Sequence, residues 1–285
     1  MKYANKSYIG LDIGGSKIEG ILWRRGKVVR HAKIRTPRSR SGFLIALKGL
    51  LTELGVKGTR GIGISVAGSI DLRRGMILKS PNLRFLKNFS PRDWVAKNFK
   101  KLARLDNDAK CFLRGELTFG QARGKKNVVA LTLGTGVGGA VAADGRLLRG
   151  SHVSAMELGH SVISREQGKF LNIEDLVSSH GFRRLGVADP LAVQNKGFAG
   201  DRKAIKIYEQ IGKYLGVGLS NFVNIFDPEL IVLGGGISRA DYLLLKPALR
   251  EMRKHTLTSL RLLPPVRISK LKYAGALGAV ALFLD

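Results

Sequence analysis

The sequence predicts an α/β protein with two similar lobes. Three observations carry this prediction: strand-like and helix-like segments alternate along the chain, a three-strand meander occurs twice, and both meanders contain a glycine-rich turn. The two meanders start about 120 residues apart, which indicates a weak internal duplication. A chain of 285 residues is long enough to bury a sizeable core in each lobe.

The first meander opens the first lobe. Its three strand-like segments, separated by the turns DIGGSK and RRGK, lie at residues 7–11, 18–23 and 28–34. An amphipathic helix is expected over residues 41–55, because Gly55 stands at its end and one face collects Phe43, Leu47, Leu50 and Leu54. The apolar segment GIGISVAG then predicts a buried strand at residues 61–68.

The second meander opens the second lobe. The glycine turn GTGVGG separates its first two strands, and the three strands are expected at residues 128–133, 140–143 and 147–150. A long amphipathic helix follows at 203–226, then the buried strand LIVLGGGIS, and a small-residue helix closes the chain at 273–285. We expect a first lobe of residues 1–108 plus this last helix, and a second lobe of residues 109–272.

Composition narrows the classes of function. Lys and Arg number 49 against 21 Asp and Glu, so the net charge is +28 and the surface attracts polyanions. The basic residues are scattered and do not interleave with aromatic side chains, so no specific nucleic-acid partner is expected. No apolar run spans a bilayer and no signal-peptide pattern opens the chain, which favours a cytoplasmic protein without a membrane partner. The single cysteine, Cys111, is expected to be a buried thiol on a helix.

The glycine-rich turns are the strongest functional signal. Glycine lets backbone N–H groups approach an anion without interference from a Cβ atom. One such turn is usually only structural, and GTGVGG is neither a Walker loop nor, because a strand follows it, a dinucleotide-binding turn. Three glycine-rich segments in a duplicated chain are much harder to explain as turns alone. Two of them occupy equivalent places in the two lobes and could grip a nucleoside triphosphate from both sides.

These segments resemble the motifs of a known superfamily. DIGGSK at 12–17, LGTGVGGA at 133–140 and VLGGGIS at 232–238 are similar, in this order, to the phosphate-one, phosphate-two and adenosine motifs of actin-like sugar kinases. ELGH at 157–160 narrows the resemblance to the ROK family of repressors, uncharacterised frames and kinases. The likeness covers essentially the whole chain. It implies an actin-like (ribonuclease H-like) ATPase fold with an ATP and sugar cleft between its duplicated lobes.

The resemblance assigns the nucleotide contacts. It implies that ATP is bound by Asp12, Gly14, Gly15, Ser16, Lys17, Gly134, Thr135, Gly136, Val137, Gly138, Gly234, Gly235 and Gly236. It also implies that Asp12 contacts Mg²⁺ through water, which suits a metal that keeps much of its hydration shell. The alternative interpretation of Asp12 is an ordinary turn aspartate beside a glycine.

The resemblance also assigns the reacting groups. Asp108, in the motif N-D-A, matches the family's general base, and a carboxylate can accept a hydroxyl proton as charge develops on the oxygen. Residues 106–108 equally suit a helix N-cap, so one of them can cap the helix while another is catalytic. The sugar contacts implied by the motifs S-P-N-L, N-D and E-x-G-H and by a later glutamate are Asn82, Asn107, Asp108, Glu157, His160 and Glu174.

The chain departs from the family pattern after His160. The family has a cysteine cluster for zinc there, whereas residues 161–174 contain no cysteine, so we expect no zinc site. His160 is then expected to contact the sugar instead. The loop is expected to be ordered by packing of its apolar side chains, Phe170, Leu171 and Ile173.

The resulting hypothesis is an ATP-dependent hexose kinase that acts on O6 of a hexose, with glucose as the default substrate by family frequency. The alternatives are a non-catalytic sugar-responsive regulator or binding protein of the same family, and an N-acetylhexosamine or fructose kinase. A repressor is disfavoured because only about ten residues precede DIGG, too few for a DNA-binding domain. A homodimer is expected, since dimers are common among these relatives.

Overall fold

The computed structural model describes residues 6–257 and 262–284, and these form two compact units. Within the described residues, unit 1 consists of 6–123, 149–154 and 271–284, and unit 2 consists of the remainder. The expected boundary after residue 108 falls at the start of helix α3 (Asp108–Phe119), whereas the chain first crosses from unit 1 to unit 2 between Arg123 and Gly124. Helix α3 therefore belongs to unit 1.

Five strands form the sheet of unit 1, in the order β3-β2-β1-β4-β7. The strands are β1 (Ser7–Ile13), β2 (Lys17–Arg24), β3 (Lys27–Arg35), β4 (Gly61–Val66) and β7 (Leu102–Asn107). β1 to β3 form the antiparallel meander, while β1, β4 and β7 run parallel. The four strands expected in this lobe are confirmed. β7 was not expected from the sequence, because Arg104 and Asp106 interrupt it and leave no apolar run of the kind that marks a buried parallel strand.

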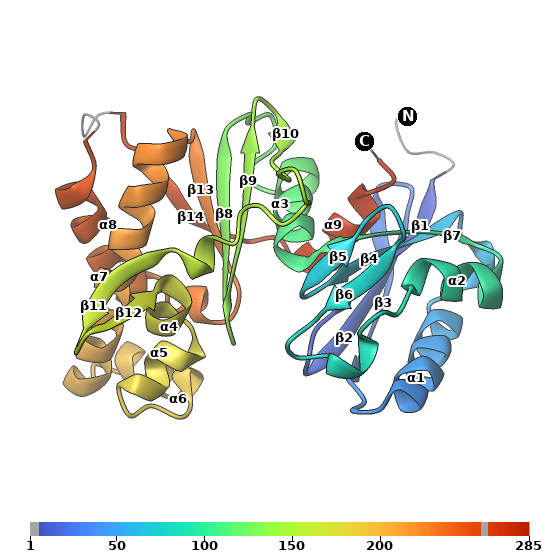
Figure 1. Cartoon of the computed structure of the whole chain (residues 1–285), viewed down its shortest axis with the longest axis horizontal. Coiled ribbons are helices and arrows are strands. Elements are labelled where there is room, and N and C mark those ends of the chain that lie inside the picture. The colour runs from blue at the N-terminus through green and yellow to red at the C-terminus, as the bar shows by residue number, and fades with distance from the viewer. Residues whose placement is uncertain (1–5, 258–261, 285) are drawn as a thin grey trace. The chain divides into compact units, whose positions relative to one another are not determined.

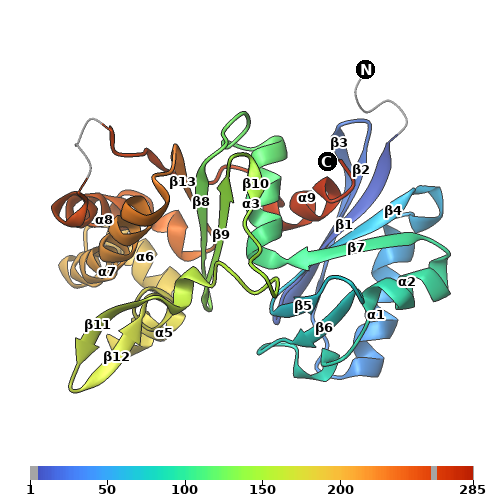
Figure 2. The same cartoon turned by 45° about the horizontal axis from the view of Figure 1, so that its top comes forward.

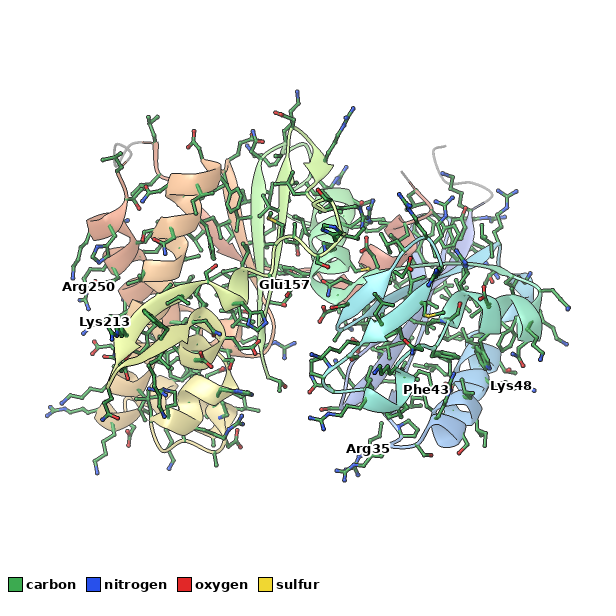
Figure 3. All side chains as sticks on the ribbon, viewed as in Figure 1. Arg35, Phe43, Lys48, Glu157, Lys213 and Arg250 are labelled. Atoms are coloured by element: carbon green, nitrogen blue, oxygen red, sulfur yellow. The ribbon has the colours of Figure 1, made fainter. Side chains whose placement is uncertain are left out.

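The two faces of this sheet are covered by different helices. On one face, Ile9 and Leu11 of β1 pack with helix α1 (Arg40–Glu53), whose Phe43 is fully buried (Figure 3). α1 ends at the expected place, where Gly55 adopts a left-handed conformation with φ of 80°. On the other face lies helix α9 (Ala274–Ala281), as both views show (Figures 1 and 2). Its backbone lies so close to the sheet that a Cβ atom at Gly63 would collide with the Ala279 carbonyl group.

Smaller elements complete unit 1. A hairpin of β5 (Ser69–Asp71) and β6 (Met76–Lys79) follows β4, and helix α2 (Pro91–Phe99) precedes β7. α3 follows β7 and packs closely on α9, where a Cβ atom at Gly278 would collide with the Cys111 carbonyl. Cys111 itself is buried on α3, as expected, and burial raises the pKa of its thiol well above the usual value.

The sheet of unit 2 repeats the topology of unit 1. Its order is β10-β9-β8-β13-β14, with an antiparallel meander followed by parallel strands. The strands are β8 (Val128–Leu133), β9 (Val137–Ala143), β10 (Arg146–Leu147), β13 (Leu230–Gly234) and β14 (Val266–Ile268). The internal duplication expected from the sequence is thus visible strand by strand. Two strands differ in extent from those expected. β9 begins already at Val137, which pairs with Leu133, and β10 ends at Leu147.

The helices of unit 2 gather around a long central one, α7 (Arg202–Phe226). α7 packs against α8 (Tyr242–His255) at a seam where Gly212 and Gly216 leave no room for a Cβ atom. The remaining elements are the hairpin β11 (Val162–Glu166) and β12 (Lys169–Asn172), and the helices α4 (Ile173–Val177), α5 (Ser179–Arg184) and α6 (Pro190–Phe198). In the part of the chain that the structure describes, no helix is long and apolar enough to cross a bilayer.

Candidate functional site

In unit 1, polar side chains converge where three parallel strands end. Asp12 of β1 lies in register with Ser65 of β4, and Ser65 lies in register with Asp106 of β7. The carboxyl ends of parallel strands meet at one edge of a sheet, where α/β proteins commonly bind ligands. Alternation along the strands places all three side chains on the face covered by α9.

Asp12 is held on two sides. The Ser65 hydroxyl donates a hydrogen bond of 2.7 Å to Asp12 Oδ1, and α9 approaches so closely that a Cβ atom at Gly275 would lie 2.6 Å from the carboxylate. Burial raises the pKa of Asp12 above its usual value. The hydrogen bond from Ser65 lowers the pKa, and the negative charge of Glu19, its partner on β2, raises it again.

The first glycine turn, residues 14–17, follows Asp12. The Gly14 N–H donates to the Lys17 carbonyl at 3.0 Å, and the Thr36 hydroxyl donates to the Gly14 carbonyl at 2.7 Å. Gly15, Ser16 and Lys17 are exposed. The turn thus has a fixed base and an open tip, as an anion-binding turn requires.

The motif S-P-N-L brings Asn82 to this turn. A Cβ atom at Gly15 would lie 2.6 Å from Asn82 Cβ, so only glycine permits this approach. Asn82 is exposed. The structure therefore joins two motifs that are far apart in the sequence.

Asn107 and Asp108 lie at the start of α3. Asn107 is the N-cap: its Oδ1 accepts hydrogen bonds from the N–H groups of Ala109 and Lys110, at 3.0 and 3.3 Å. Its Nδ2 donates to the Gly68 carbonyl at 3.2 Å. Asp108 is the first residue of the helix, is half-buried, and accepts from the Ala109 N–H at 3.0 Å. Because Asn107 already caps the helix, capping alone does not account for Asp108.

In unit 2, hydrogen bonds from neighbouring residues fix the base of the second glycine turn. The Gly134 N–H donates to the Gly136 carbonyl at 3.0 Å, and Ser179 donates to the Gly134 carbonyl through its N–H at 2.9 Å and its hydroxyl at 3.2 Å. Glu174 Oε2 accepts a hydrogen bond of 2.8 Å from the Val137 N–H. Glu174, expected as a sugar contact, is therefore bound directly to the second glycine turn.

The E-x-G-H motif forms a short turn of 3₁₀ helix (Leu158–His160) against β9. Gly159 lies on Val137, where a Cβ atom would collide with the Val137 carbonyl oxygen. Glu157, labelled in Figure 3, and His160 are both exposed, and the His160 N–H donates to the Glu157 carbonyl at 3.0 Å. The motif thus presents two polar side chains from one rigid turn.

The cysteine-free segment after His160 is an ordered β-hairpin. Leu171 and Ile173 are buried, as expected. The expectation for Phe170 was wrong: its side chain is 69% exposed, because it points outward from the hairpin and stacks under the Arg165 guanidinium. Among the described residues, no three His, Cys, Asp or Glu side chains come together as a metal site.

One carboxylate ties this hairpin to two helices. Glu166 accepts hydrogen bonds from Arg184 of α5 at 2.8 Å and from the Tyr214 hydroxyl of α7 at 3.1 Å. Neither partner stands near Glu166 in the sequence, and no motif pointed to them. Glu166 therefore orders the hairpin that leads into Glu174.

The third glycine segment ends β13. Gly234 is buried at the end of the strand, while Gly235 and Gly236 are exposed. Gly235 has a φ of 87°, and a Cβ atom there would collide with the Leu133 carbonyl oxygen, so glycine is required. The Ser238 hydroxyl donates to the Gly235 carbonyl at 2.8 Å and fixes the turn.

Comparison with known proteins agrees with this geometry. A family model described as the ROK family matches residues 8–285. The glucokinase of Thermotoga maritima is 32% identical, over 85% of this chain and 86% of that protein. The N-acetyl-D-glucosamine kinase of Photobacterium profundum is 29% identical, over 88% of this chain and 90% of that protein. A Streptomyces griseus ROK family glucokinase, solved with glucose and AMPPNP, has a TM-score of 0.82 at 25% identity and covers 97% of this chain and 98% of its own.

The fold class is therefore the two-lobed α/β fold of the actin-like ATPases, with the same strand order in both units. Within that class, the chain belongs to the ROK family. Its similarity to glucokinases and to an N-acetylglucosamine kinase supports a sugar kinase.

Proposed function

We propose that this chain is an ATP-dependent hexose kinase that transfers the γ-phosphoryl group of ATP to O6 of glucose. The observation that carries the proposal is the placement of Asp108. Its carboxylate stands at the first position of α3, next to Asn107 and at the edge of the sheet where Asp12 and Ser65 also lie. Phosphoryl transfer needs such a carboxylate to accept the proton of the attacking hydroxyl.

In the proposed reaction, Asp108 accepts the proton of the sugar's O6 hydroxyl as O6 attacks the γ-phosphorus. A bond forms between O6 and phosphorus, the bond to the β,γ-bridging oxygen breaks, and ADP leaves. Asn82 is proposed to bind sugar hydroxyls through its amide group, which can both donate and accept. Asn107 is proposed to donate to the sugar with the second hydrogen of its Nδ2, because its Oδ1 already accepts two backbone N–H groups. The sugar contacts expected of Glu157, His160 and Glu174 in unit 2 stay predictions.

The glycine turns are proposed to bind the ATP phosphates. In each turn the first glycine carbonyl accepts a side-chain hydroxyl and the tip stays open to solvent, so backbone N–H groups can reach an anion. Lys17 stands in the first turn as a positive charge for phosphate oxygens. The segment Gly234–Gly236 is proposed to lie beside the adenosine, because exposed glycine backbone permits the close approach of a flat base.

The surroundings of Asp12 fit a magnesium ion. Asp12 offers carboxylate oxygens, Ser65 donates to Oδ1, and Gly275 leaves a space that a Cβ atom would fill. Mg²⁺ characteristically binds one or two carboxylates, substrate phosphates and several waters. When bound with ATP, the ion would neutralise charge that develops on the β- and γ-phosphates. Asp12 is the residue proposed to hold it, through water.

The experiment is an ADP-release assay with Mg·ATP and a panel of sugars: glucose, 6-deoxyglucose, N-acetylglucosamine and fructose. We expect turnover with glucose and none with 6-deoxyglucose, because the accepting hydroxyl is missing. Nuclear magnetic resonance of the product should place the phosphate on O6. A higher kcat/KM with N-acetylglucosamine would replace glucose as the substrate. ATP binding without turnover on any sugar would contradict the kinase and favour a regulator.

A cytoplasmic location and a homodimer also stay predictions.

A further inference from the structure

A short segment, Arg149–Ser154, returns from unit 2 to unit 1 and then leads back to unit 2. We call it the crossing segment. It belongs to unit 1, although β10 before it and Ala155 after it belong to unit 2. It contains neither helix nor strand, and one backbone hydrogen bond, from the Val153 N–H to the Gly150 carbonyl at 3.3 Å, lies within it, so its side-chain contacts matter for its position. Two such contacts come from residues on either side of Asp108.

The first contact is an ion pair with a buried carboxylate. Arg149 binds Asp106 with both arms of its guanidinium: Nη2 lies 2.6 Å from Oδ2 and Nη1 lies 3.2 Å from Oδ1. Asp106 is only 1% exposed, so its charge requires a partner, and a bidentate arginine fixes both distance and orientation. Asp106 Oδ1 also accepts from the Asn107 N–H at 2.9 Å, so the pair reaches the backbone next to Asp108.

The second contact comes from a buried lysine. Lys110, only 3% exposed on α3, donates from Nζ to the Val153 carbonyl at 3.0 Å. Val153 has a φ of 61°, a left-handed conformation that β-branched residues adopt only when their surroundings force it. Met156, just before Glu157, also has a positive φ, of 72°. The crossing segment and the residues after it are therefore held in a costly conformation, which is typical of functional sites.

The positions of the two anchors bear on catalysis. Asp106 lies two residues before Asp108 and Lys110 two residues after it, so both ends of the backbone around Asp108 are fastened to the same segment. We propose that Arg149 is a positioning residue for phosphoryl transfer: by binding Asp106, it holds the start of α3 so that Asp108 meets the attacking hydroxyl. This inference rests on the proposed function. Loss of such positioning by about 1 Å can lower a rate about 100-fold.

The experiment compares three variants: Arg149→Met, Asp106→Asn, and the two combined. Each single variant leaves one charge or buried polar group without its partner, so both should lower the melting temperature as well as kcat. The combined variant removes both members of the pair, and the amide introduced at position 106 can still accept from the Asn107 N–H. Arg114, whose pKa the Asp106 charge raises, loses that charge in Asp106→Asn and in the combined variant alike. We therefore expect the combined variant to melt at a higher temperature than Asp106→Asn, while kcat stays about 10- to 100-fold below that of the unaltered protein. The KM for ATP should change less than threefold.

The matched control is Arg104→Met, which alters an arginine on β7, the strand that also carries Asp106. Arg104 donates from Nη1 to the Leu282 carbonyl at 2.6 Å and stacks on Phe283, away from Asp108. The control removes one arginine and one backbone contact, and it should leave kcat within twofold. If the combined variant regains both stability and kcat, the pair is only structural and the inference is wrong. If the unaltered protein phosphorylates no sugar, the proposed function fails first, and the variants' melting temperatures still report whether the pair is a stabilising one.

Lys110→Met tests the other anchor separately. It keeps most of the buried aliphatic stem but removes the donor to the Val153 carbonyl. We expect a lower kcat with a nearly unchanged KM for ATP, in the same direction as Arg149→Met. An unchanged kcat in a folded Lys110→Met protein would contradict the role of the crossing segment in holding α3.

Discussion

The two glycine turns occupy the same place on two sheets of the same topology. In each unit the turn joins the first two strands of the meander, after Ile13 in β1 and after Leu133 in β8. In each, a hydroxyl from elsewhere in the unit donates to the carbonyl of the first glycine: Thr36 to Gly14, and Ser179 to Gly134. The base of the turn is therefore fixed in the same way twice.

The turns differ in charge. Aligning Gly14 with Gly134 sets Asp12 opposite Thr132, and the first turn also carries Lys17, whereas the second turn carries no charged residue of its own. The second turn is instead braced by Glu174, which binds the Val137 N–H. We propose that the duplicated scaffold serves two tasks: the first turn, with Asp12 before it, places charged groups, whereas the second binds through uncharged backbone.

The largest effect is expected at the charged turn. Asp12→Asn keeps the size and one acceptor oxygen but removes the charge, and it should lower kcat about 1,000-fold, as loss of a strong electrostatic group at a reacting centre does. Thr132→Ala, at the corresponding position of unit 2, should change kcat less than threefold. Steady-state kinetics with Mg·ATP and glucose measure both. Equal losses in the two variants would contradict the division between the turns.

The ionised carboxylate of Asp12 should also lower the free energy of unfolding, by an amount that depends on pH. Because burial raises its pKa, the folded state binds the proton more readily than the unfolded chain, so the free energy of unfolding falls as pH rises above the usual aspartate pKa. Asn does not titrate. The melting temperature of Asp12→Asn relative to the unaltered protein should therefore increase between pH 4 and pH 7 without magnesium. A difference that is flat or falls with pH would contradict this assignment.

The sheets themselves differ where helix α9 lies on unit 1. Gly10 and Gly63 meet the backbone of α9, while the corresponding residues of unit 2 are Ala130 and Val232. Gly63→Ala should therefore lower the free energy of unfolding by about 3 kcal/mol, since the added methyl meets backbone that cannot turn aside. Gly49→Ala, on the exposed side of α1 with no atom near its Cβ position, should instead raise it by about 0.5–1 kcal/mol. Thermal unfolding of the two variants should shift in opposite directions, and a shared direction would contradict the packing argument.

Variants of Glu174 test how the second glycine turn is held. Glu174→Ala leaves the Val137 N–H without its acceptor, and we expect kcat/KM for ATP to fall about 10-fold. Glu174→Gln keeps an acceptor oxygen and should lose less than threefold. If the KM for the sugar rises instead while the KM for ATP is constant, Glu174 acts as the sugar contact that the motif implied and not as a brace for the turn.

The smallest effect concerns the strained crossing segment. Val153→Gly removes the penalty of a left-handed β-branched residue but adds freedom to the unfolded chain, so the free energy of unfolding should rise by about 0.5–1 kcal/mol. Chemical denaturation measures the change. A destabilised variant would mean that the Val153 side chain contributes more by packing than its backbone costs.

Much of the fold could be predicted from the sequence, because alternation and glycine turns are local signals. Strands β1, β2 and β8 and helix α1 with its end at Gly55 follow directly from them. β7 was missed, since an edge strand with Arg104 and Asp106 on one face lacks the apolar run of a buried parallel strand. Phe170 was misjudged because an aromatic residue in a hairpin can stack on an arginine as well as enter a core.

The candidate site divides in the same way. Motifs indicated the residues to which we assign chemistry, such as Asp12 and Asp108, because particular residue types recur at particular spacings. The supporting residues could not be predicted: Ser65, Thr36 and Arg149 are ordinary residues far in the sequence from their partners Asp12, Gly14 and Asp106, and only the sheet register and the chain path bring them together. Supporting contacts of this kind depend on tertiary structure, which no local pattern records.

The most direct test of the central claim is to compare kcat of the unaltered protein with that of Asp108→Asn, using Mg·ATP and the preferred hexose, and to measure ADP and sugar affinity of both by calorimetry. Asn107 caps α3 in either case, so the variant should fold and bind both ligands within threefold of the unaltered protein. The account predicts a kcat lower by about 100-fold or more, the contribution of a general base. A variant that keeps more than a tenth of the original kcat would show that another group accepts the proton.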